Sequence, residues 1–303
     1  MSAQTPYPQS PDAQPSATVI PAGEMGALGA KDAKVNAAAL RTIVLGFLAV
    51  VIMLPWQGLI VKFAARFYAA IPIAFHNVMC WAFGVRLRRV GTRSDAPGVL
   101  YVVNHISWLD IPVLGAAIRG SFVAKAEIEN WGFFGTLAKL QRTIFVVRER
   151  RTSSAQQRNQ IVEHLAQGHN VVLFPEGTSS AGNGVLPFKS ALFSVVEAAQ
   201  TEGLEPVIQP VSLAYTSVNS IPLVRANRHA ISWVGDMEFL PHLLQVMGLS
   251  AIDATVHFHE PVRLEEFDSR KALAQHCEIV VGQGVRLANS GRLEASQLVA
   301  KAL

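Results

Sequence analysis

The distribution of apolar and polar residues divides the 303-residue chain into three regions. Residues 1–38 are rich in Pro, Gln, Ser and Ala and lack an apolar period, which predicts a disordered tail. Residues 39–90 are strongly apolar, whereas over 91–303 short apolar runs alternate with amphipathic stretches. The pattern therefore predicts a membrane anchor with interfacial helices over 39–90 and an α/β domain over 91–303.

The anchor region begins with an uncharged run from Thr42 to Ile60. A spanning helix needs about 20 apolar residues, so this run predicts either a transmembrane helix or a segment inserted into one leaflet with a bend at Pro55. The next stretch, Val61 to Val85, is apolar but contains Lys62 and Arg66, which suits a helix that lies at the membrane interface or packs against the first helix. A buried helical hairpin of a soluble core is the alternative.

Beyond the anchor, short apolar runs at regular intervals predict the strands of a sheet. Helical stretches separate them, among them 153–167 and 190–199. This alternation is typical of an α/β fold, and we expect a mixed, largely parallel sheet of about seven strands flanked by helices. The expected strands lie near residues 98–103, 121–124, 144–148, 170–174, 207–213, 229–234 and 254–259.

Composition narrows the function classes. Hydrophobic residues make up 50% of the chain and charged residues 16%, and the net charge is +4. This small and scattered excess favours an anionic lipid surface as a partner and argues against nucleic acid. The two cysteines, Cys80 and Cys277, form neither a disulfide framework nor a cysteine zinc site, which indicates a reducing compartment.

Cofactor motifs are also missing from the sequence. His257 and His259 alternate along an expected strand, but no third ligand follows at a useful spacing, so we expect no metal. The chain contains neither a phosphate-binding nucleotide loop nor a dinucleotide fingerprint. We therefore expect no nucleotide cofactor.

The strongest chemical signal lies where two apolar runs end. Val99–Val103 leads into His105, and Asp110 follows five residues later. A neutral imidazole accepts a proton best when an anion holds its second nitrogen, so this pair predicts a general base. A second run, Val171–Pro175, leads into the polar residues that begin at Glu176. If the two strands are parallel, both polar clusters lie at the same edge of the sheet.

These segments belong to a set of four sequence blocks that resembles the glycerolipid acyltransferase family. The best-known members of that family are 1-acylglycerol-3-phosphate (lysophosphatidate) acyltransferases, and the resemblance covers about residues 98 to 213. The blocks are Asn104, His105 and Asp110; Ile144 to Arg148; Phe174 to Thr178; and Val207 to Val211.

The resemblance implies acyl transfer from an acyl thioester to a lysolipid hydroxyl. His105 would be the general base, and Asp110 would hold its tautomer. No covalent acyl-enzyme is required, which fits the absence of a Gly-x-Ser-x-Gly motif. Backbone N–H groups after Phe174 are candidates for binding the oxyanion. The candidate substrate-binding residues are Asn104, Lys125, Arg148, Glu176, Gly177, Thr178 and Lys189.

The acceptor remains open between two lipids. Family members that use phosphate acceptors usually carry arginine after Glu-Gly-Thr, but this chain has Ser179 there. Residues 179–182, 186–193 and 233–237 also resemble bacterial lyso-ornithine lipid O-acyltransferases. Our first expectation is lysophosphatidate, because that activity is commoner in the family, and lyso-ornithine lipid is the alternative.

The resemblance also implies the partners and the location. The acyl donor would be a thioester of acyl carrier protein or coenzyme A, used as a co-substrate without a further cofactor. We expect the protein in the inner (cytoplasmic) membrane, with its catalytic domain facing the cytoplasm. Two other interpretations are a lipid or thioester hydrolase in which His105 activates water, and a non-enzymatic lipid-binding protein of the membrane.

Overall fold

A computed structural model describes residues 37–63, 70–146 and 151–293 of the chain. The predicted tail lies outside these residues except for its last two positions, which begin the first helix. The division into tail, anchor and catalytic domain stays a prediction.

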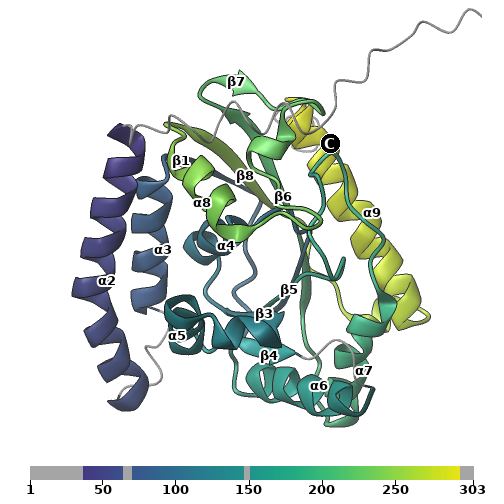
Figure 1. The fold of residues 1–303 in the computed structure, drawn as a ribbon. Helices are drawn as coiled ribbons and strands as arrows, with labels where there is room; N and C mark the ends of the chain where they lie inside the picture. Colours follow the sequence, from purple (N-terminus) through teal and green to yellow (C-terminus); the bar gives the residue numbers. More distant parts are fainter. Residues whose placement is uncertain (1–36, 64–69, 147–150, 294–303) are drawn as a thin grey trace, which may run out of the picture. The chain divides into compact units, whose positions relative to one another are not determined.

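The described part of the chain forms a mixed sheet of eight strands in the order β1-β8-β6-β2-β5-β3-β4, with β7 paired to β6 (Figure 1). Pairing is parallel from β6 through β2, β5 and β3 to β4, and β8 joins β6 in the antiparallel direction. The expected mixed, largely parallel α/β sheet is confirmed. The strands are β1 (Val85–Val90), β2 (Leu100–Val103), β3 (Ser121–Lys125), β4 (Ile144–Val146), β5 (Val171–Leu173), β6 (Ile208–Val218), β7 (Ile221–Pro222) and β8 (Ile252–Phe258).

Helices cover both faces of this sheet, which is why its central strands are continuous apolar runs. Every residue of β2 and β5 is buried. One apolar core joins the sheet to α3, α4 and α8, and a second joins it to α6, α7 and α9. These helices, with α5 near the sheet edge, are α3 (Ala70–Ala82), α4 (Asp110–Ala117), α5 (Gly132–Leu140), α6 (Arg151–Ala166), α7 (Ser194–Thr201), α8 (Phe239–Met247) and α9 (Arg270–Asn289).

Strand β7 has no counterpart in the sequence-based expectation, and two further segments differ from it. The expected strand at 229–234 is instead a short 3-10 turn, Arg228–Ala230, because the Arg228 carbonyl accepts both the backbone N–H and the hydroxyl of Ser232. Conversely, Val85–Val90 lies in the range assigned to the anchor but forms strand β1, paired with β8. Arg86 on this strand forms two hydrogen bonds of 2.6 Å with the Asp253 carboxylate.

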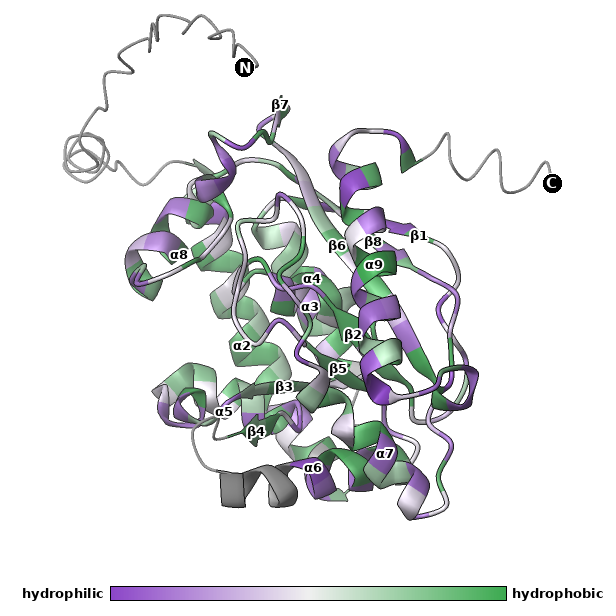
Figure 2. Cartoon of the chain, turned by 90° about the vertical axis from the view of Figure 1, so that its right-hand side faces the viewer, coloured by the Kyte–Doolittle hydropathy of each residue, from purple (hydrophilic) through white to green (hydrophobic). Residues whose placement is uncertain are grey.

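The apolar run near the N-terminus forms α2 (Ala37–Phe63), a helix that continues through Pro55. Within the residues that the structure describes, it is the one helix long and apolar enough to cross a membrane, and 17% of that apolar window is buried. Figure 2 shows α2 largely in the hydrophobic colour. Two side-chain hydrogen bonds attach α2 to other helices. Thr42 donates to the Ala82 carbonyl at the end of α3 (2.7 Å), and Gln57 donates to the Leu140 carbonyl at the end of α5 (2.8 Å).

Helix α3 lies between α2 and α4, and a glycine permits its close approach to α4. A Cβ atom at Gly115 of α4 would lie only 2.2 Å from Cδ2 of His76 on α3. His76 is buried there, and its Nε2 is 2.9 Å from Oε1 of Gln141. Since α4 begins at Asp110, the helix that starts at this carboxylate also packs on α3.

Candidate active site

His105 and Asp110 form a hydrogen-bonded pair just beyond the carboxyl end of β2. His105 Nδ1 is 2.7 Å from Asp110 Oδ2. The carboxylate favours a proton on Nδ1, which leaves Nε2 as the acceptor nitrogen. Within the described residues Nε2 has no hydrogen-bond partner, and the His105 side chain is 20% exposed. The imidazole is therefore oriented and reachable, as a general base must be.

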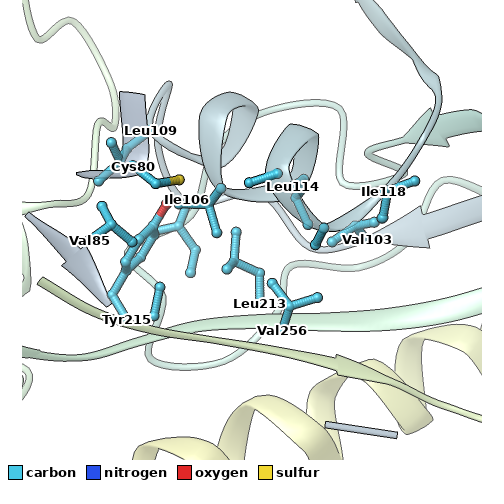
Figure 3. Packing of buried hydrophobic residues seen from close by; sticks show 14 of the residues in the cluster. Cys80, Val85, Val103, Ile106, Leu109, Leu114, Ile118, Leu213, Tyr215 and Val256 are labelled. Carbon is cyan, nitrogen blue, oxygen red and sulfur yellow. The ribbon is translucent and has the colours of Figure 1, made fainter. Parts of the chain in front are cut away.

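The Asp110 carboxylate is fully buried and receives several donors. Its Oδ2 accepts the backbone N–H groups of Ile106 (2.6 Å) and Ser107 (3.1 Å) in addition to His105. Its Oδ1 accepts the hydroxyl of Tyr215, on β6, at 2.9 Å. Burial, and then the neighbouring Asp110 charge, hold the pKa of Tyr215 well above its usual range, so the hydroxyl stays a donor. Figure 3 shows the Tyr215 ring inside the apolar cluster.

Sequence reasoning missed Tyr215, although it contacts the pair directly. The residue lies 105 positions after Asp110 and is embedded in an apolar strand. A buried tyrosine in a strand carries no local sign that its hydroxyl contacts a carboxylate. Only the pairing of β2 with β6 brings the two residues together.

Asn104 joins the end of β2 to the neighbouring strand β6. Its side-chain Nδ2 donates to the Leu213 carbonyl (2.9 Å), and its Oδ1 accepts the Leu213 N–H (2.8 Å). The side chain is completely buried, so both of its polar atoms are occupied by this backbone pair. In the structure Asn104 fixes the direction of the chain that carries His105, and its expected substrate contact stays a prediction.

Glu176 follows β5 and holds two loops together. Its Oε1 accepts the His105 backbone N–H at 2.9 Å, and its Oε2 accepts the Leu186 N–H at 3.0 Å. The residue is only 2% exposed. Burial raises the pKa of its carboxyl to about 7, against the opposing effect of the two backbone donors. The geometry makes Glu176 a support of the loop that carries His105, while acceptor binding by this residue stays a prediction.

The loop after β5 is also attached to the His105 loop by serines. The backbone N–H (2.8 Å) and hydroxyl (3.0 Å) of Ser180 both donate to the His105 carbonyl. The Ser179 hydroxyl donates to the Trp233 carbonyl, and the Trp233 N–H donates to the Ile106 carbonyl at 3.0 Å. The two polar clusters expected at one edge of the sheet thus share direct hydrogen bonds.

Of the two described lysines that the sequence offered as substrate-binding residues, Lys189 lies at the loop after β5 and Lys125 lies at the end of β3. Gly177 has a φ of +70°, and a Cβ there would lie 2.5 Å from the Lys189 ammonium, so Lys189 sits directly over the loop. Thr178 beside it is exposed. Lys125 is exposed at the end of β3, where it pairs with Glu127 at 3.1 Å. Arg148 lies outside the described residues, so its expected role stays a prediction.

Aromatic rings form one wall beside the imidazole. The His105 ring stacks on Phe174 with centroids 4.3 Å apart, and Phe122 also stacks on Phe174, with centroids 6.3 Å apart. These apolar rings exclude water from one face of the base, which strengthens the electrostatic contact between His105 and Asp110.

Across the parts of the chain that the structure describes, no group of three His, Cys, Asp or Glu residues could hold a metal ion. His257 and His259 have ring centroids 4.1 Å apart, and His259 Nε2 is 2.6 Å from the Ser212 hydroxyl. Burial, and then the neighbouring His257, lower the pKa of His259 to about 3. Half-buried beside the Ser212 hydroxyl, His259 has the environment of a neutral structural histidine.

Comparisons with known proteins place this site in a family. The family model described as Acyltransferase matches residues 86–214. The lyso-ornithine lipid O-acyltransferase of Brucella abortus is 43% identical over 228 residues, which cover 75% of this chain and 85% of that protein. The chain belongs to the acyltransferase family. The lyso-ornithine lipid O-acyltransferase of Rhizobium meliloti is 37% identical, over 74% of this chain and 76% of that protein.

Two further acyltransferases are similar to parts of the chain. The 1-acyl-sn-glycerol-3-phosphate acyltransferase of Neisseria gonorrhoeae is 43% identical over 96 residues, or 32% of this chain and 38% of that protein. The crystal structure of the 1-acyl-sn-glycerophosphate acyltransferase of Thermotoga maritima matches with a TM-score of 0.59 and 22% identity, covering 81% of this chain and 93% of that one. The latter match shows a shared fold.

Membership of this acyltransferase family confirms the expected class of reaction. The chain is an enzyme that acts on lysolipids with an acyl donor. Of the two acceptors expected from the sequence, the extended similarity favours the alternative, lyso-ornithine lipid, over lysophosphatidate.

Proposed function

We propose that this acyltransferase transfers a fatty acyl group to the hydroxyl of a lyso-ornithine lipid. The observation that carries the proposal is the extent of similarity to the Brucella enzyme of that name, which covers 85% of that protein. The similarity to the Neisseria enzyme is as high in identity but covers only 38% of that protein. We therefore infer the acceptor from the relatives that match this chain along most of their length.

The residue at position 179 agrees with a non-phosphate acceptor. Arginine forms a forked, charge-assisted bond with phosphate, whereas Ser179 is neutral and donates its hydroxyl to the Trp233 carbonyl. A lyso-ornithine lipid presents a hydroxyl on a fatty chain and an amino-acid head group. It carries no phosphate that would need an arginine at this position.

In the proposed mechanism His105 acts on the acceptor and on the leaving group. Nε2 takes the proton of the acceptor hydroxyl as its oxygen attacks the thioester carbonyl carbon, while Asp110 stabilises the imidazolium. Backbone N–H groups of the loop after Phe174 would bind the oxyanion of the tetrahedral intermediate. When the intermediate collapses, the C–S bond breaks, and the departing thiolate takes the proton from His105.

The decisive experiment supplies both donors and both acceptors to the purified full chain in lipid vesicles. Acyl carrier protein and coenzyme A thioesters are each tested with lyso-ornithine lipid and with 1-acylglycerol-3-phosphate, and products are identified by mass spectrometry. We expect diacylated ornithine lipid as the main product. Release of free fatty acid regardless of acceptor would instead indicate a hydrolase.

Transfer to 1-acylglycerol-3-phosphate is the second candidate function. The 43% identity to the Neisseria enzyme and the Lys189 ammonium over Gly177 favour it. Phosphatidate as the main product of the same experiment would establish this reaction and refute the first proposal.

We also propose that the enzyme works at the inner membrane, with the catalytic site in the cytoplasm. The apolar helix α2 supports membrane attachment, and the two buried free cysteines, Cys80 and Cys277, fit a reducing compartment. Protease added to intact spheroplasts should leave the catalytic domain uncut, whereas protease added to inverted vesicles should digest it. The reverse pattern would place the site outside the cytoplasm.

A further inference from the structure

Two short helices next to the active site expose large apolar side chains to their surroundings. They are α5, with the tryptophan before it, and α8. An exposed apolar patch of this kind marks a contact surface for a partner or a membrane. The α5–α8 surface consists of residues that are 39–60% exposed: Trp131, Phe133, Phe134, Leu240 and Leu244.

Aromatic contacts connect this surface to the catalytic loops. Phe239, the first residue of α8, contacts the rings of Trp131 and Phe134 with centroids 5.5 and 5.2 Å away. On its other side it contacts Trp108 at 5.7 Å and Trp233 at 6.1 Å. Trp108 lies within the loop that carries His105 and Asp110. The Trp233 carbonyl accepts a hydrogen bond from the Ser179 hydroxyl, in the loop after β5. The α5–α8 surface therefore borders the active site.

The same surface continues the exposed face of α2. Helix α2 contacts both α5 and α8, and it lies on the side of the sheet away from α9 (Figures 1 and 2). Its attachments at Thr42 and Gln57 are separated by about 22 Å along the helix axis, given a rise of roughly 1.5 Å per residue. Since α2 is held along its side, a lipid layer that covers its outer face also reaches α5 and α8.

The charges of the surface favour lipid over an acidic protein. The lysines beside α5 are paired with glutamates of the same segment, Lys125 with Glu127 (3.1 Å) and Lys139 with Glu129 (3.2 Å). Helix α8 contains no Asp, Glu, Lys or Arg. A surface for an acidic carrier protein needs cations without such partners, whereas the apolar part of a leaflet needs neutral, apolar side chains.

We propose that the α5–α8 surface is a second membrane-contact surface, which enters the same leaflet as α2 and lets the acceptor lipid reach His105 from the bilayer. The proposal rests on the proposed lysolipid acylation, because such an acceptor is held in the membrane by its fatty chain. In this proposal, apolar side chains of α5 and α8 enter the membrane in addition to those of α2.

The first test measures lipid contact residue by residue in the full chain. Phe133→Cys and Leu244→Cys are each labelled with a fluorescent thiol reagent, and the two native cysteines are buried. Phe47→Cys on α2 serves as the membrane reference and Ile279→Cys on α9 as the control, both being exposed. The variants are bound to phosphatidylcholine–phosphatidylglycerol vesicles with brominated acyl chains, which quench only labels inside the bilayer.

We expect quenching at positions 133, 244 and 47 and none at 279. Quenching at 47 alone, or at none of the four positions, would overturn the proposal. So would protection of positions 133 and 244 by acyl carrier protein without quenching by lipid. An acyl-transfer assay on the same labelled proteins reports separately on the proposed function, so the two failures are distinguishable.

A second test links the surface to catalysis. The variant Phe133→Ser/Leu240→Ser/Leu244→Ser should raise KM for acceptor in vesicles about tenfold, because three apolar side chains no longer leave water on binding. Its kcat toward acceptor dispersed as monomers in detergent should stay unchanged. Leu192→Ser/Ile279→Ser, on the α9 side, is the matched control. An equal rise of KM in the control would contradict the proposal.

Discussion

The His105–Asp110 pair is held by residues from three separate parts of the chain. Asp110 receives two backbone N–H groups of its own loop and the hydroxyl of Tyr215 from β6. The His105 backbone is bound by Glu176 after β5. The spacing of His105 and Asp110 allowed their contact to be predicted from the sequence. The contribution of Tyr215 depends on strand pairing and has no local sequence signal, whereas Glu176 was expected at this edge of the sheet but as a substrate-binding residue.

Substitutions in the pair should remove turnover while the fold remains. His105→Ala removes the base, and Asp110→Asn removes the counter-charge and permits the wrong tautomer, so each should lower kcat by about three orders of magnitude or more. Product formation and circular dichroism are measured on the same purified samples. Undiminished transfer by His105→Ala would refute the base assignment.

Tyr215→Phe tests the third contact of the carboxylate. One buried oxygen of Asp110 loses its donor, which should destabilise the fold by about 1–3 kcal/mol and lower kcat about tenfold with little change in KM. Tyr101→Phe is the matched control, since this buried tyrosine on β2 donates to the Ser94 carbonyl, away from the pair. If both variants lower kcat equally, Tyr215 has only a structural role.

Glu176 should make the stability of the protein depend on pH. Its pKa is 4.5 ordinarily and about 7 in the folded state, so between these values the folded chain binds more protons than the unfolded chain. Stability should therefore fall as the pH rises from about 4.5 to about 7, by up to about 3 kcal/mol from this group. Denaturant unfolding of wild type and Glu176→Gln across this range measures the difference. Parallel pH curves for the two proteins would disprove the effect.

At the level of elements, the sequence predicted the buried strands better than the edge of the sheet. Strands β2, β3, β4 and β5 were expected within a few residues, because parallel strands covered on both faces are continuous apolar runs. Strand β1 was missed, since its exposed arginines resemble a charged boundary segment. The false strand at 229–234 is apolar, but its backbone groups are used in a turn.

Helix α9 holds the loop that follows β5 by two hydrogen bonds. Glu278 on this helix accepts the Phe188 N–H at 2.7 Å, and Asn289 donates to the Gly182 carbonyl at 3.0 Å. The loop thus lies between the catalytic pair and α9, so its position near His105 depends on both.

Removing these attachments should loosen the loop and slow the reaction. We expect Glu278→Ala/Asn289→Ala to lower kcat about tenfold and to increase amide hydrogen exchange over residues 182–189, since each lost bond is worth about 1 kcal/mol. Gln275→Ala, an exposed change on the same helix, is the control. Unchanged exchange in the double variant would show that the loop is held by its contacts to His105 alone.

At the level of the whole molecule, we expect attachment to the membrane to depend on apolar area more than on charge. The net charge is only +4, whereas the outer face of α2 exposes a row of large apolar side chains. For 42–60 the structure shows one helix that continues through Pro55, long and apolar enough for the predicted span, and held along its side by the rest of the described chain. That arrangement depends on contacts of α2 with α5 and α8, which are distant in the sequence.

Salt should therefore fail to release the enzyme from membranes. We expect the full chain to stay in the membrane pellet at about 1 M NaCl, where surface charges are screened within roughly 3 Å, and to be extracted by mild detergent. Sedimentation and immunoblotting measure both fractions. Release by salt alone would show that lipid head-group charge, not apolar insertion, holds the protein.

The closeness of α3 and α4 at Gly115 gives this enzyme an unusual weak point. The only side chain that fits between His76 and α4 is a hydrogen atom, and α4 starts with the carboxylate that orients the base. An alanine at 115 would therefore push α3 and α4 apart. A single methyl group at this position would thus disturb the apolar helix pair and the start of the Asp110 helix together.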